Sequence, residues 1–413
     1  MKKKILIFLC DQYPFSSGEF FIDDEMRVLA LEFERIIIYT ASAVSTNSIK
    51  RFLPSNAEVV SFSRQNIEFG KIKSIFKICS PIVIAELIFI MRIIPIKYWY
   101  ASIKIMFVEL HRSVNLKNDL IQLCKLKNVN ISDCLFYSYW HDYRALALAL
   151  LRKEDAIVTC VARAHGGDNF RRRFTPPYLP FKRFMLSFLT YTIPISNKGK
   201  EEFVQYASGK EKIIVSRLGK FNSRVPLFEK KDFNKIIIVS CSNLIADKRV
   251  SLIVDVISEL GERNVVWHHF GSGEQENFIK NYAKVKLKDC TYKFWGVVDN
   301  RTILDFYSTQ YVDMFINLSL WEGVPVSIME ALSSGIPVLA TDAGGTSEIV
   351  NEQVGFLVST DFSSSKIATI INNYLNLPIL SQYSYRKNAY LFWNDNYNAE
   401  KNFKKFCDIL RTI

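Results

Sequence analysis

The stretch WEGVPVSIMEALSSGIPVLATDAGGTSEIV, from Trp321 to Val350, decides the fold class of this chain. An apolar run at 312–319 precedes it, a helical pattern begins near Val326, and a second apolar run occupies 336–341. Strand, helix and strand in this order form the unit from which parallel sheets with helices on both faces are built. The stretch therefore predicts an α/β fold.

The same order of strands and helices recurs in both halves of the chain. Apolar runs at 4–9 and 35–40 flank a helical pattern in the first half, and runs at 235–243 and 264–273 do so in the second. This repetition predicts two Rossmann-like domains, with a boundary in the polar segment 217–234. The expected ranges are 1–220 for the first domain, 221–395 for the second, and 396–413 for a C-terminal helix that packs back on the first domain.

The composition limits the class of partner. The chain has 413 residues, enough for two domains, and its contents of 49% hydrophobic and 23% charged residues are those of a globular protein. The formal net charge of +12 indicates an anionic partner, such as nucleic acid, acidic phospholipid or a phosphorylated small molecule. Nucleic acid is disfavoured, because the sequence has no helix-turn-helix, RNP or zinc-finger pattern.

The cysteines and the N-terminal run indicate the compartment. The eight cysteines are scattered and form no C-x-x-C pair, which argues against a thiolate zinc site or a disulfide framework and fits a reducing compartment. The apolar run near Met1 is short and ends at Asp11 without a small-residue cleavage site. We therefore expect a buried first strand rather than a signal peptide, and a cytoplasmic protein.

Residues 72–110 combine apolar, cationic and aromatic side chains. Glu86, Arg92 and two prolines interrupt the apolar run, so a membrane-spanning helix is disfavoured. From Lys71 to Arg112 there are seven Lys or Arg residues and two acids. This pattern is typical of helices that lie on an anionic membrane surface. The alternative is a buried helical pair whose lysines reach solvent, and the sequence leaves both open.

Two glutamates, Glu322 and Glu330, stand eight residues apart in the opening stretch. On one continuous helix they would lie roughly 80° apart around the axis and about 12 Å apart along it, too far to share a site. Gly323 and Pro325 instead predict that the helix begins between them. A helix N-terminus offers free N–H groups and the positive end of a dipole to a phosphate. We therefore predict a phosphate site with one acid before the helix and one in its first turns.

These residues carry a resemblance to a known family. The segment EGVPVSIMEALSSGIPVLATDAGGTSEIV resembles the E-x7-E donor-binding signature of the family 4 retaining glycosyltransferases, which have the GT-B fold. CSNLIADKRV, HHFGSGEQE and FWGVVDN resemble the neighbouring segments that hold the diphosphate and lie near the nucleotide base. In the first half, PFSSGEFF resembles the N-terminal glycine loop. YSYWHDYRALALALL and RAHGGDNF resemble the acceptor side of exopolysaccharide and O-antigen transferases.

The resemblance implies that two Rossmann-like domains face a central cleft, the first binding the acceptor and the second a nucleotide-sugar donor. On the donor side, Glu330 would bind the nucleotide ribose, Glu322 would face the donor sugar, and Lys248 would stabilise the leaving diphosphate. Many members carry an arginine where this chain has Asn243, so one cation is missing, and we expect Arg249 or the helix ends to compensate. The implied donor-binding residues are Gly18, Asn243, Lys248, Arg249, Gly323, Val324, Pro325, Val326 and Glu330.

On the acceptor side, the resemblance makes His165 the active-site histidine that contacts the transferring sugar. The residue alone also fits a histidine that caps the end of a strand. The implied catalytic residues are His165, Lys248 and Glu322, and the acceptor-side candidates are Trp140, Arg163 and Asp168. The basic cluster at 170–183 is expected to meet lipid headgroups or a pyrophosphate-linked acceptor, or to be a solvated loop.

The sequence contains no His, Asp and Glu cluster at metal-ligand spacing, so we expect no metal and no cofactor beside a nucleotide-sugar co-substrate. The resemblance implies a metal-independent, hexosyltransferase-type enzyme that uses a UDP-sugar and front-face attack assisted by the leaving phosphate. Its acceptor would be a lipid-linked glycan or an oligosaccharide in capsule or O-antigen synthesis. The enzyme would act as a peripheral protein at the inner face of a bacterial cell membrane. Two alternatives remain: a GT-B nucleotide-sugar epimerase, and a weakly active, membrane-bound scaffold of a polysaccharide assembly complex.

Overall fold

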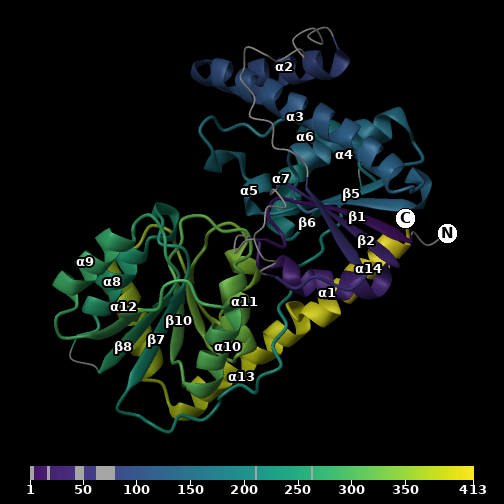
Figure 1. Cartoon of the computed structure of the whole chain (residues 1–413). Helices are drawn as coiled ribbons and strands as arrows, with labels where there is room; N and C mark the ends of the chain where they lie inside the picture. The colour runs from purple at the N-terminus through teal and green to yellow at the C-terminus, as the bar shows by residue number, and fades with distance from the viewer. Residues whose placement is uncertain (1–3, 16–18, 42–50, 62–79, 210–211, 262–263) are drawn as a thin grey trace. The chain divides into compact units, whose positions relative to one another are not determined.

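The computed structural model describes residues 4–15, 19–41, 51–61, 80–209, 212–261 and 264–413 (Figure 1). The chain divides into two compact units. Unit 1 comprises Met1–Arg217 and Phe403–Ile413, and unit 2 comprises Leu218–Asn402.

Unit 1 is built on a six-stranded parallel sheet with the spatial order β3-β2-β1-β4-β5-β6. Its strands are rich in Ile, Val, Phe and Tyr, which pack well on a pleated surface. The strands are β1 Ile5–Cys10, β2 Arg35–Thr40, β3 Ala57–Ser61, β4 Cys134–Ser138, β5 Thr159–Ala164 and β6 Tyr191–Pro194.

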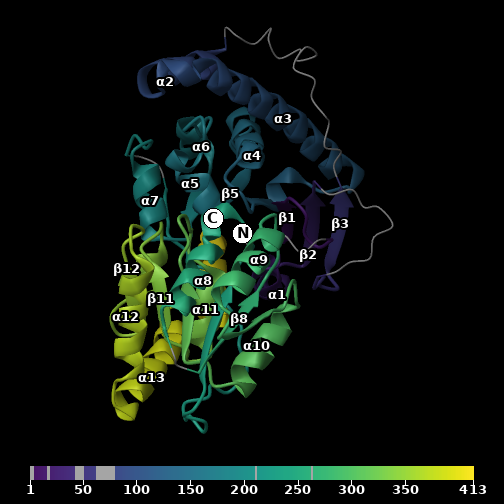
Figure 2. The same cartoon turned by 90° about the vertical axis from the view of Figure 1, so that its left-hand side faces the viewer.

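Helices cover both faces of this sheet (Figure 1 and Figure 2). Alternate strand residues point to opposite faces, so strands β1 to β5 contribute to two hydrophobic clusters, whereas β6 contributes to one. One cluster packs against α2, α3, α4, α6 and α7, and the other packs against α1 and α14. The helices are α1 Ile22–Glu32, α2 Pro81–Ile93, α3 Trp99–Leu126, α4 Tyr143–Glu154, α5 Gly166–Asn169, α6 Lys182–Phe188, α7 Asn197–Val204 and α14 Ala399–Arg411.

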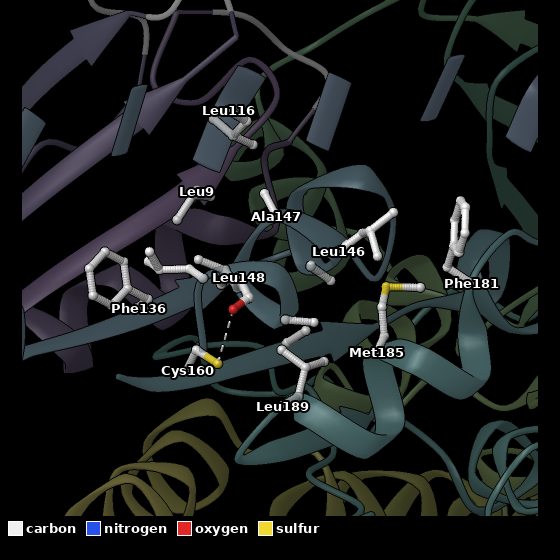
Figure 3. Close-up of a cluster of buried hydrophobic side chains, with 14 of the residues drawn as sticks. Leu9, Leu116, Phe136, Leu146, Ala147, Leu148, Cys160, Phe181, Met185 and Leu189 are labelled. Carbon is white, nitrogen blue, oxygen red and sulfur yellow. Dashed lines mark hydrogen bonds between the residues drawn. The ribbon is translucent and has the colours of Figure 1, made fainter. Parts of the chain in front are cut away.

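Figure 3 shows part of the larger cluster of unit 1. Leu9 and Phe136 project from the sheet, and Leu116 of α3 with Leu148 of α4 lies against them. The Cys160 thiol donates a hydrogen bond to the Leu148 carbonyl at 3.8 Å. This core fixes α3 and α4 over the sheet and thereby positions the loops at its edge.

Unit 2 repeats the architecture with a second six-stranded parallel sheet, in the order β12-β11-β10-β7-β8-β9. Helices α8, α9 and α12 pack on one face, while α11 and α13 pack together on the other (Figure 1). The strands are β7 Ile236–Cys241, β8 Val265–Phe270, β9 Thr291–Phe294, β10 Met314–Asn317, β11 Val338–Thr341 and β12 Gly355–Val358. The helices are α8 Val250–Ser258, α9 Glu276–Lys286, α10 Asn300–Thr309, α11 Val326–Ser333, α12 Ser364–Leu375 and α13 Ile379–Asn396.

Both sheets have the strand order of a Rossmann fold. Counted from its own first strand, each runs 3-2-1-4-5-6, read from one edge or the other. The predicted α/β class with two Rossmann-like domains is therefore confirmed. The order reverses direction between β1 and β4 in unit 1 and between β7 and β10 in unit 2.

Where the structure describes the segment 72–110, it forms α2, the short turn Ile96–Tyr98 and the start of α3; residues 72–79 lie outside the described residues. The charge of Glu86 suggested that it interrupts the apolar surface of the segment. In the structure it does not, because its side chain points inward. Its carboxylate accepts hydrogen bonds from the Tyr178 hydroxyl and the Phe181 N–H, each at 2.9 Å. Burial raises the pKa of Glu86 to about 6.

The opposite side of α2 and the turn after it is apolar and exposed. We call this surface the apolar face; it consists of Ile84, Ile88, Met91, Ile93, Ile96 and Tyr100. Arg92, Lys97 and Lys104 are exposed within the same stretch of chain, while Glu86 is buried and Glu109 is half-buried. The inner face of α2 packs on the core, so the segment is buried on one side and open on the other. Among the described residues, no helix is both long enough and apolar enough to cross a membrane.

Candidate active site

Ligands of open parallel sheets bind beyond the carboxyl ends of the strands, at the point where the strand order reverses. In unit 2 this point lies between β7 and β10, and the loops that leave them are residues 242–249 and 318–325. The backbone N–H of Leu320 donates to the Asp247 carbonyl at 2.7 Å, which joins the two loops. The candidate site of unit 2 lies where these loops meet.

Lys248 and Glu322 form an ion pair across the two loops. The Lys248 Nζ lies 2.6 Å from the Glu322 Oε1, and the Asn317 side-chain amide donates to the same oxygen at 3.2 Å. The Lys248 and Glu322 side chains keep 21% and 11% of their surface exposed, so an anionic ligand can reach the ammonium group. The structure thus brings together two of the predicted catalytic residues.

The loop after β11 packs tightly on the backbone of Glu322 and Gly323. A Cβ atom at Gly344 would lie 1.8 Å from the Glu322 carbonyl oxygen, and one at Gly345 would lie 2.3 Å from the Gly323 carbonyl oxygen. Gly344 also has a φ of +57°, a conformation that favours glycine. The Gly345 N–H donates to the Gly323 carbonyl at 2.8 Å. The two glycines therefore fix the backbone that leads into α11.

Helix α11 begins at Val326, between Glu322 and Glu330, as the sequence predicts. Pro325 precedes it with an extended backbone, φ −67° and ψ 119°, and Val324 is buried beside it. The first N–H groups of an α-helix have no partner within the helix. Lys248 and Glu322 thus lie at the entrance to a helix N-terminus, the type of group that binds phosphate.

Glu330 is almost completely buried, with 2% of its surface exposed. Its Oε1 accepts a hydrogen bond from the Asn300 side-chain amide at 2.6 Å and lies 3.5 Å from the Lys220 Nζ. The sequence analysis did not identify Lys220 or Asn300 as site residues. Asn300 ends the FWGVVDN segment, which was a usable signal, whereas nothing near Lys220 in the sequence pointed to Glu330.

Arg249 is used by the fold itself. Its Nε donates to the Leu318 carbonyl at 2.7 Å, and a terminal nitrogen of its guanidinium donates to the Thr360 carbonyl at 2.8 Å. These bonds tie the 242–249 loop to the chain that leaves β10 and to the chain that leaves β12. The geometry gives Arg249 a structural role, while Asn243 lies exposed in the same loop.

In unit 1 the corresponding edge of the sheet lies at the ends of β1 and β4, where a buried carboxylate organises the chain. Glu19 accepts backbone hydrogen bonds from Asp11 at 3.0 Å and from Gln12 and Tyr13 at 2.7 Å each. The Trp140 indole N–H donates to the same carboxylate at 2.6 Å. Sequence reasoning missed Glu19, although it lies in the PFSSGEFF segment.

A polar pocket of about 270 Å³ lies next to this carboxylate. Arg144 is buried in its wall and forms ion pairs with Asp142 at 2.5 Å and Asp11 at 3.2 Å. Gly18, the predicted glycine of the neighbouring loop, lies outside the described residues. The pocket is lined by Asp11, Gln12, Glu19, Trp140, Asp142 and Arg144.

His165 directly follows β5 and packs against the aromatic residues of the same edge. The centroid of its ring lies 4.7 Å from that of Tyr139 and 4.9 Å from that of Trp140. Burial and the nearby charge of Arg163 lower the pKa of His165 to about 3, so the imidazole is neutral. Among the described residues its buried Nε2 has no hydrogen-bond partner.

Asp168 positions the backbone at His165. Its Oδ2 accepts the His165 backbone N–H at 2.9 Å, and burial raises the pKa of Asp168 to about 6. Asp168 therefore supports the histidine from the first turn of α5.

Arg163 is a core residue, which corrects its predicted place on the acceptor side. It has no exposed surface and forms an ion pair with Glu25 at 3.2 Å. Its guanidinium also donates to the Tyr137 hydroxyl and the Ser216 carbonyl, each at 2.8 Å, and lies over the Phe406 ring. The physical reason is the alternation of side chains along β5, which turns Arg163 to the face covered by α1 and α14.

Comparison with known proteins finds a family match in unit 2. Residues 225–392 match the sequence model of the family described as Glycosyl transferases group 1, and the match includes Lys248, Glu322, Glu330 and Gly344. The matched segment lies within unit 2 and is similar to group 1 glycosyltransferases. This match confirms the family resemblance that the E-x7-E segment indicated.

The chain also resembles proteins named for polysaccharide biosynthesis. The chain is 33% identical to the O-antigen biosynthesis glycosyltransferase WbnH of Escherichia coli over 132 residues, 31% of this chain and 36% of that protein. It is 24% identical to the amylovoran biosynthesis glycosyltransferase AmsK of Erwinia amylovora over 222 residues, 50% of this chain and 53% of that protein. The matches thus span about a third to a half of the length of these two relatives.

A solved structure extends the likeness of fold to both units. Anabaena HepE in complex with UDP and glucose has a TM-score of 0.66 with this chain at 15% identity. The comparison covers 99% of this chain and 100% of HepE. At this identity the likeness concerns the fold, which is GT-B.

Proposed function

We propose that this protein is a retaining glycosyltransferase that moves a sugar from a nucleotide-diphosphate donor to a glycan in bacterial surface polysaccharide synthesis. The observation that carries the proposal is the Lys248–Glu322 pair, which puts a cation beside the N-terminus of α11 within the matched domain. WbnH and AmsK, whose names place them in O-antigen and amylovoran synthesis, support the process. The UDP in the HepE complex supports UDP as the nucleotide. The matched family consists of transferases, which does not favour the epimerase alternative.

In this proposal the donor binds to unit 2. Its diphosphate lies at the N-terminus of α11, where backbone N–H groups and the Lys248 ammonium offset its charge. Glu322 holds Lys248 while the site has no donor, and accepts a hydroxyl of the donor sugar once the ammonium turns to the phosphate. Glu330 binds the ribose, and Asn300 fixes the direction of its carboxylate.

The proposed transfer keeps the configuration of the anomeric carbon. An acceptor hydroxyl forms a bond to that carbon on the face from which the nucleotide diphosphate leaves. The bond between the carbon and the phosphate oxygen breaks, and the hydroxyl proton passes to that oxygen. Lys248 stabilises the negative charge on the diphosphate as it departs, so this step uses electrostatic stabilisation by the protein's own groups and needs no metal.

We assign the acceptor to unit 1, beside His165 and Trp140. Because the imidazole of His165 is neutral, it acts as a hydrogen-bonding group toward a sugar hydroxyl and not as a cation. Asp168 holds the backbone at this position, and the carboxylate of Glu19 holds the indole of Trp140. We expect the acceptor to be an oligosaccharide or a lipid-linked glycan.

We further propose that the apolar face lies on an anionic membrane surface. Its exposed aliphatic side chains can enter the interfacial region of a bilayer, and the exposed Arg92, Lys97 and Lys104 can pair with lipid phosphates. Glu86 does not oppose this contact because it is buried, and the half-buried Glu109 is paired with Arg112. Such a contact would bring the enzyme to lipid-linked acceptors at the inner face of the cell membrane.

The proposal is tested by thermal unfolding of the full chain with UDP, GDP and ADP, followed by assays with the corresponding hexose donors. A nucleotide present at 100 times its dissociation constant stabilises the folded state by about 2.7 kcal/mol. We expect UDP to raise the midpoint of unfolding. We also expect a UDP-hexose to yield free UDP and a product whose anomeric carbon has the same configuration, α or β, as in the donor. Inversion of the linkage would reject the retaining mechanism. Binding without turnover on any donor and glycan would support the scaffold alternative instead.

A further inference from the structure

Unit 1 contains a second cavity, of about 330 Å³, that the proposed roles do not use. It lies between α3, the start of α4 and the loop that precedes α6, within the size range of small-molecule pockets. Asp142 lines both this cavity and the polar pocket beside Trp140. Asp168, which supports His165, lines it too. The cavity therefore adjoins the site that we assign to the acceptor.

The charged groups of this cavity already face opposite charges. The Glu109 carboxylate is 2.9 Å from the Arg112 guanidinium, and the Asp142 carboxylate is 2.5 Å from that of Arg144. Lys182 and Asp168 are close enough that the charge of each acts on the other. A phosphate group in this space would meet three carboxylates and one ammonium. The charge of the cavity therefore disfavours an anionic ligand.

The ammonium of Lys182 is held inside the protein by its neighbour. Its Nζ donates to the His141 carbonyl at 2.6 Å and lies 3.1 Å from the His141 Nδ1. Burial lowers the pKa of Lys182 to about 8, and only 4% of the residue is exposed. A buried ammonium beside carboxylates provides donors and acceptors at fixed positions, as uncharged polar ligands require.

The other walls are apolar and partly aromatic. Ile105 and Leu146 lie on one side, and Phe174 and Tyr178 belong to the loop before α6. Tyr178 is buried and held by its bond to Glu86, whereas Phe174 is 40% exposed at the rim. A long lipid chain would offer no hydrogen bond to the polar groups of this cavity, and each buried polar group left without a partner costs about 1–3 kcal/mol. The cavity thus suits a compact molecule with both apolar surface and hydroxyl groups.

We propose that this cavity binds an uncharged sugar ring of the acceptor. In this arrangement the ring's C–H face lies against Phe174 and Tyr178, and its hydroxyls bond to Glu109, Asp142 and Lys182. The inference rests on the proposed function and narrows it, because unit 1 would recognise the glycan part of the acceptor and not its phosphate or lipid. Glu109 and Lys182 become specificity residues for that sugar.

The cavity can be observed without turnover through the Ile105 side chain, which lies in its wall. The full chain is labelled with ¹³C at the isoleucine δ1 methyl groups, and an Ile105→Val variant assigns the signal. The probes are the methyl α-glycosides of glucose, galactose and N-acetylglucosamine, and inorganic phosphate, each with and without UDP. The internal reference is the methyl signal of Ile371, buried in the core of unit 2.

We expect at least one glycoside to shift the Ile105 signal to saturation, while phosphate leaves it unchanged and Ile371 does not respond to any glycoside. Phe174→Ala should lower the affinity for that glycoside about 2- to 10-fold, the range for loss of one aromatic contact. Phe233→Ala, which truncates an exposed phenylalanine of unit 2, should not change the affinity. A shift with phosphate, or no shift with any glycoside, would overturn the inference. Donor turnover is measured separately, so a saturable Ile105 shift in an inactive protein would reject the proposed function and leave the sugar site standing.

Discussion

Replacing Lys248 with alanine separates a catalytic from a structural role for the Lys248–Glu322 pair. The ion pair is short but keeps 21% and 11% of its two side chains exposed. Exposed pairs contribute roughly 0.2–1 kcal/mol, whereas breaking a buried pair costs about 3–5 kcal/mol. We therefore expect Lys248→Ala to lower the free energy of unfolding by about 1–2 kcal/mol, because Glu322 keeps its bond from Asn317 and part of its solvent contact.

The effect on turnover should be larger. Loss of one preorganised group that stabilises transition-state charge typically reduces kcat about 10²- to 10³-fold, or roughly 3–4 kcal/mol. The assay is the release of UDP and the formation of product at saturating donor, compared with the unfolding free energy from urea titration. Lys248→Arg keeps the cation in a different geometry and should recover part of the rate.

A second ion pair near the other end of β10 supplies the matched control. The Lys230 Nζ lies 2.6 Å from the Asp313 carboxylate, and these side chains are 8% and 1% exposed. Lys230→Ala should therefore cost about 3 kcal/mol of stability with the kcat of the folded protein unchanged. If Lys248→Ala turns over within about threefold of the wild type, its role at the leaving diphosphate is refuted.

Three further predictions concern the loop, the pH and the membrane. Gly344→Ala should destabilise unit 2 and abolish UDP binding in calorimetry, because its Cβ would meet a carbonyl oxygen at 1.8 Å. Gly261→Ala, also at positive φ but with open space around it, should cost only about 1 kcal/mol and keep UDP affinity. The pKa of Glu86 is raised to about 6 in the folded protein, so its contribution to stability falls as pH rises from about 4.5 to about 6. Glu86→Gln should remove that part of the slope in urea titrations, about 2 kcal/mol in all, and an unchanged slope would contradict the assignment. Ile88→Glu should abolish sedimentation with anionic vesicles at low salt. The control is Leu126→Glu, an exposed residue at the far end of α3, about 40 Å from the first residue of that helix, and it should not change sedimentation. Equal sedimentation of both variants would argue against membrane contact through the apolar face.

Local patterns in the sequence were sufficient to predict the fold class and the helix start in the candidate site of unit 2. Short β-branched runs alternating with helical patterns specify parallel sheets whatever their partners are. Gly323 and Pro325 specify a helix start by their own backbone preferences, so the position of α11 between Glu322 and Glu330 could be predicted without any distant contact. The contact of Gly344 and Gly345 with the backbone of Glu322 and Gly323 appears only in the structure.

Side-chain direction was decided by burial. Arg163 precedes His165 by two residues, and the family resemblance implied a place on the acceptor side for it. In the structure it points into the core, because Glu25 and the Tyr137 hydroxyl offset the cost of burying the guanidinium. Glu19 shows the reverse case. Nothing in the sequence was a reason to select this acid in a loop, yet it accepts hydrogen bonds from three backbone groups and from Trp140.

The sequence by itself determined the α/β class, the helix start between the two glutamates and the resemblance of the second domain to glycosyltransferases. Only the tertiary structure decided which side chains meet. Lys248 pairs with Glu322 because β7 and β10 are neighbours in the sheet although two strands separate them in the chain. Lys220 and Asn300 reach Glu330 from separate segments of the chain in the same way. A parallel sheet reorders its strands through crossover connections, so the contacts at its carboxyl edge depend on that order and cannot be read from local sequence.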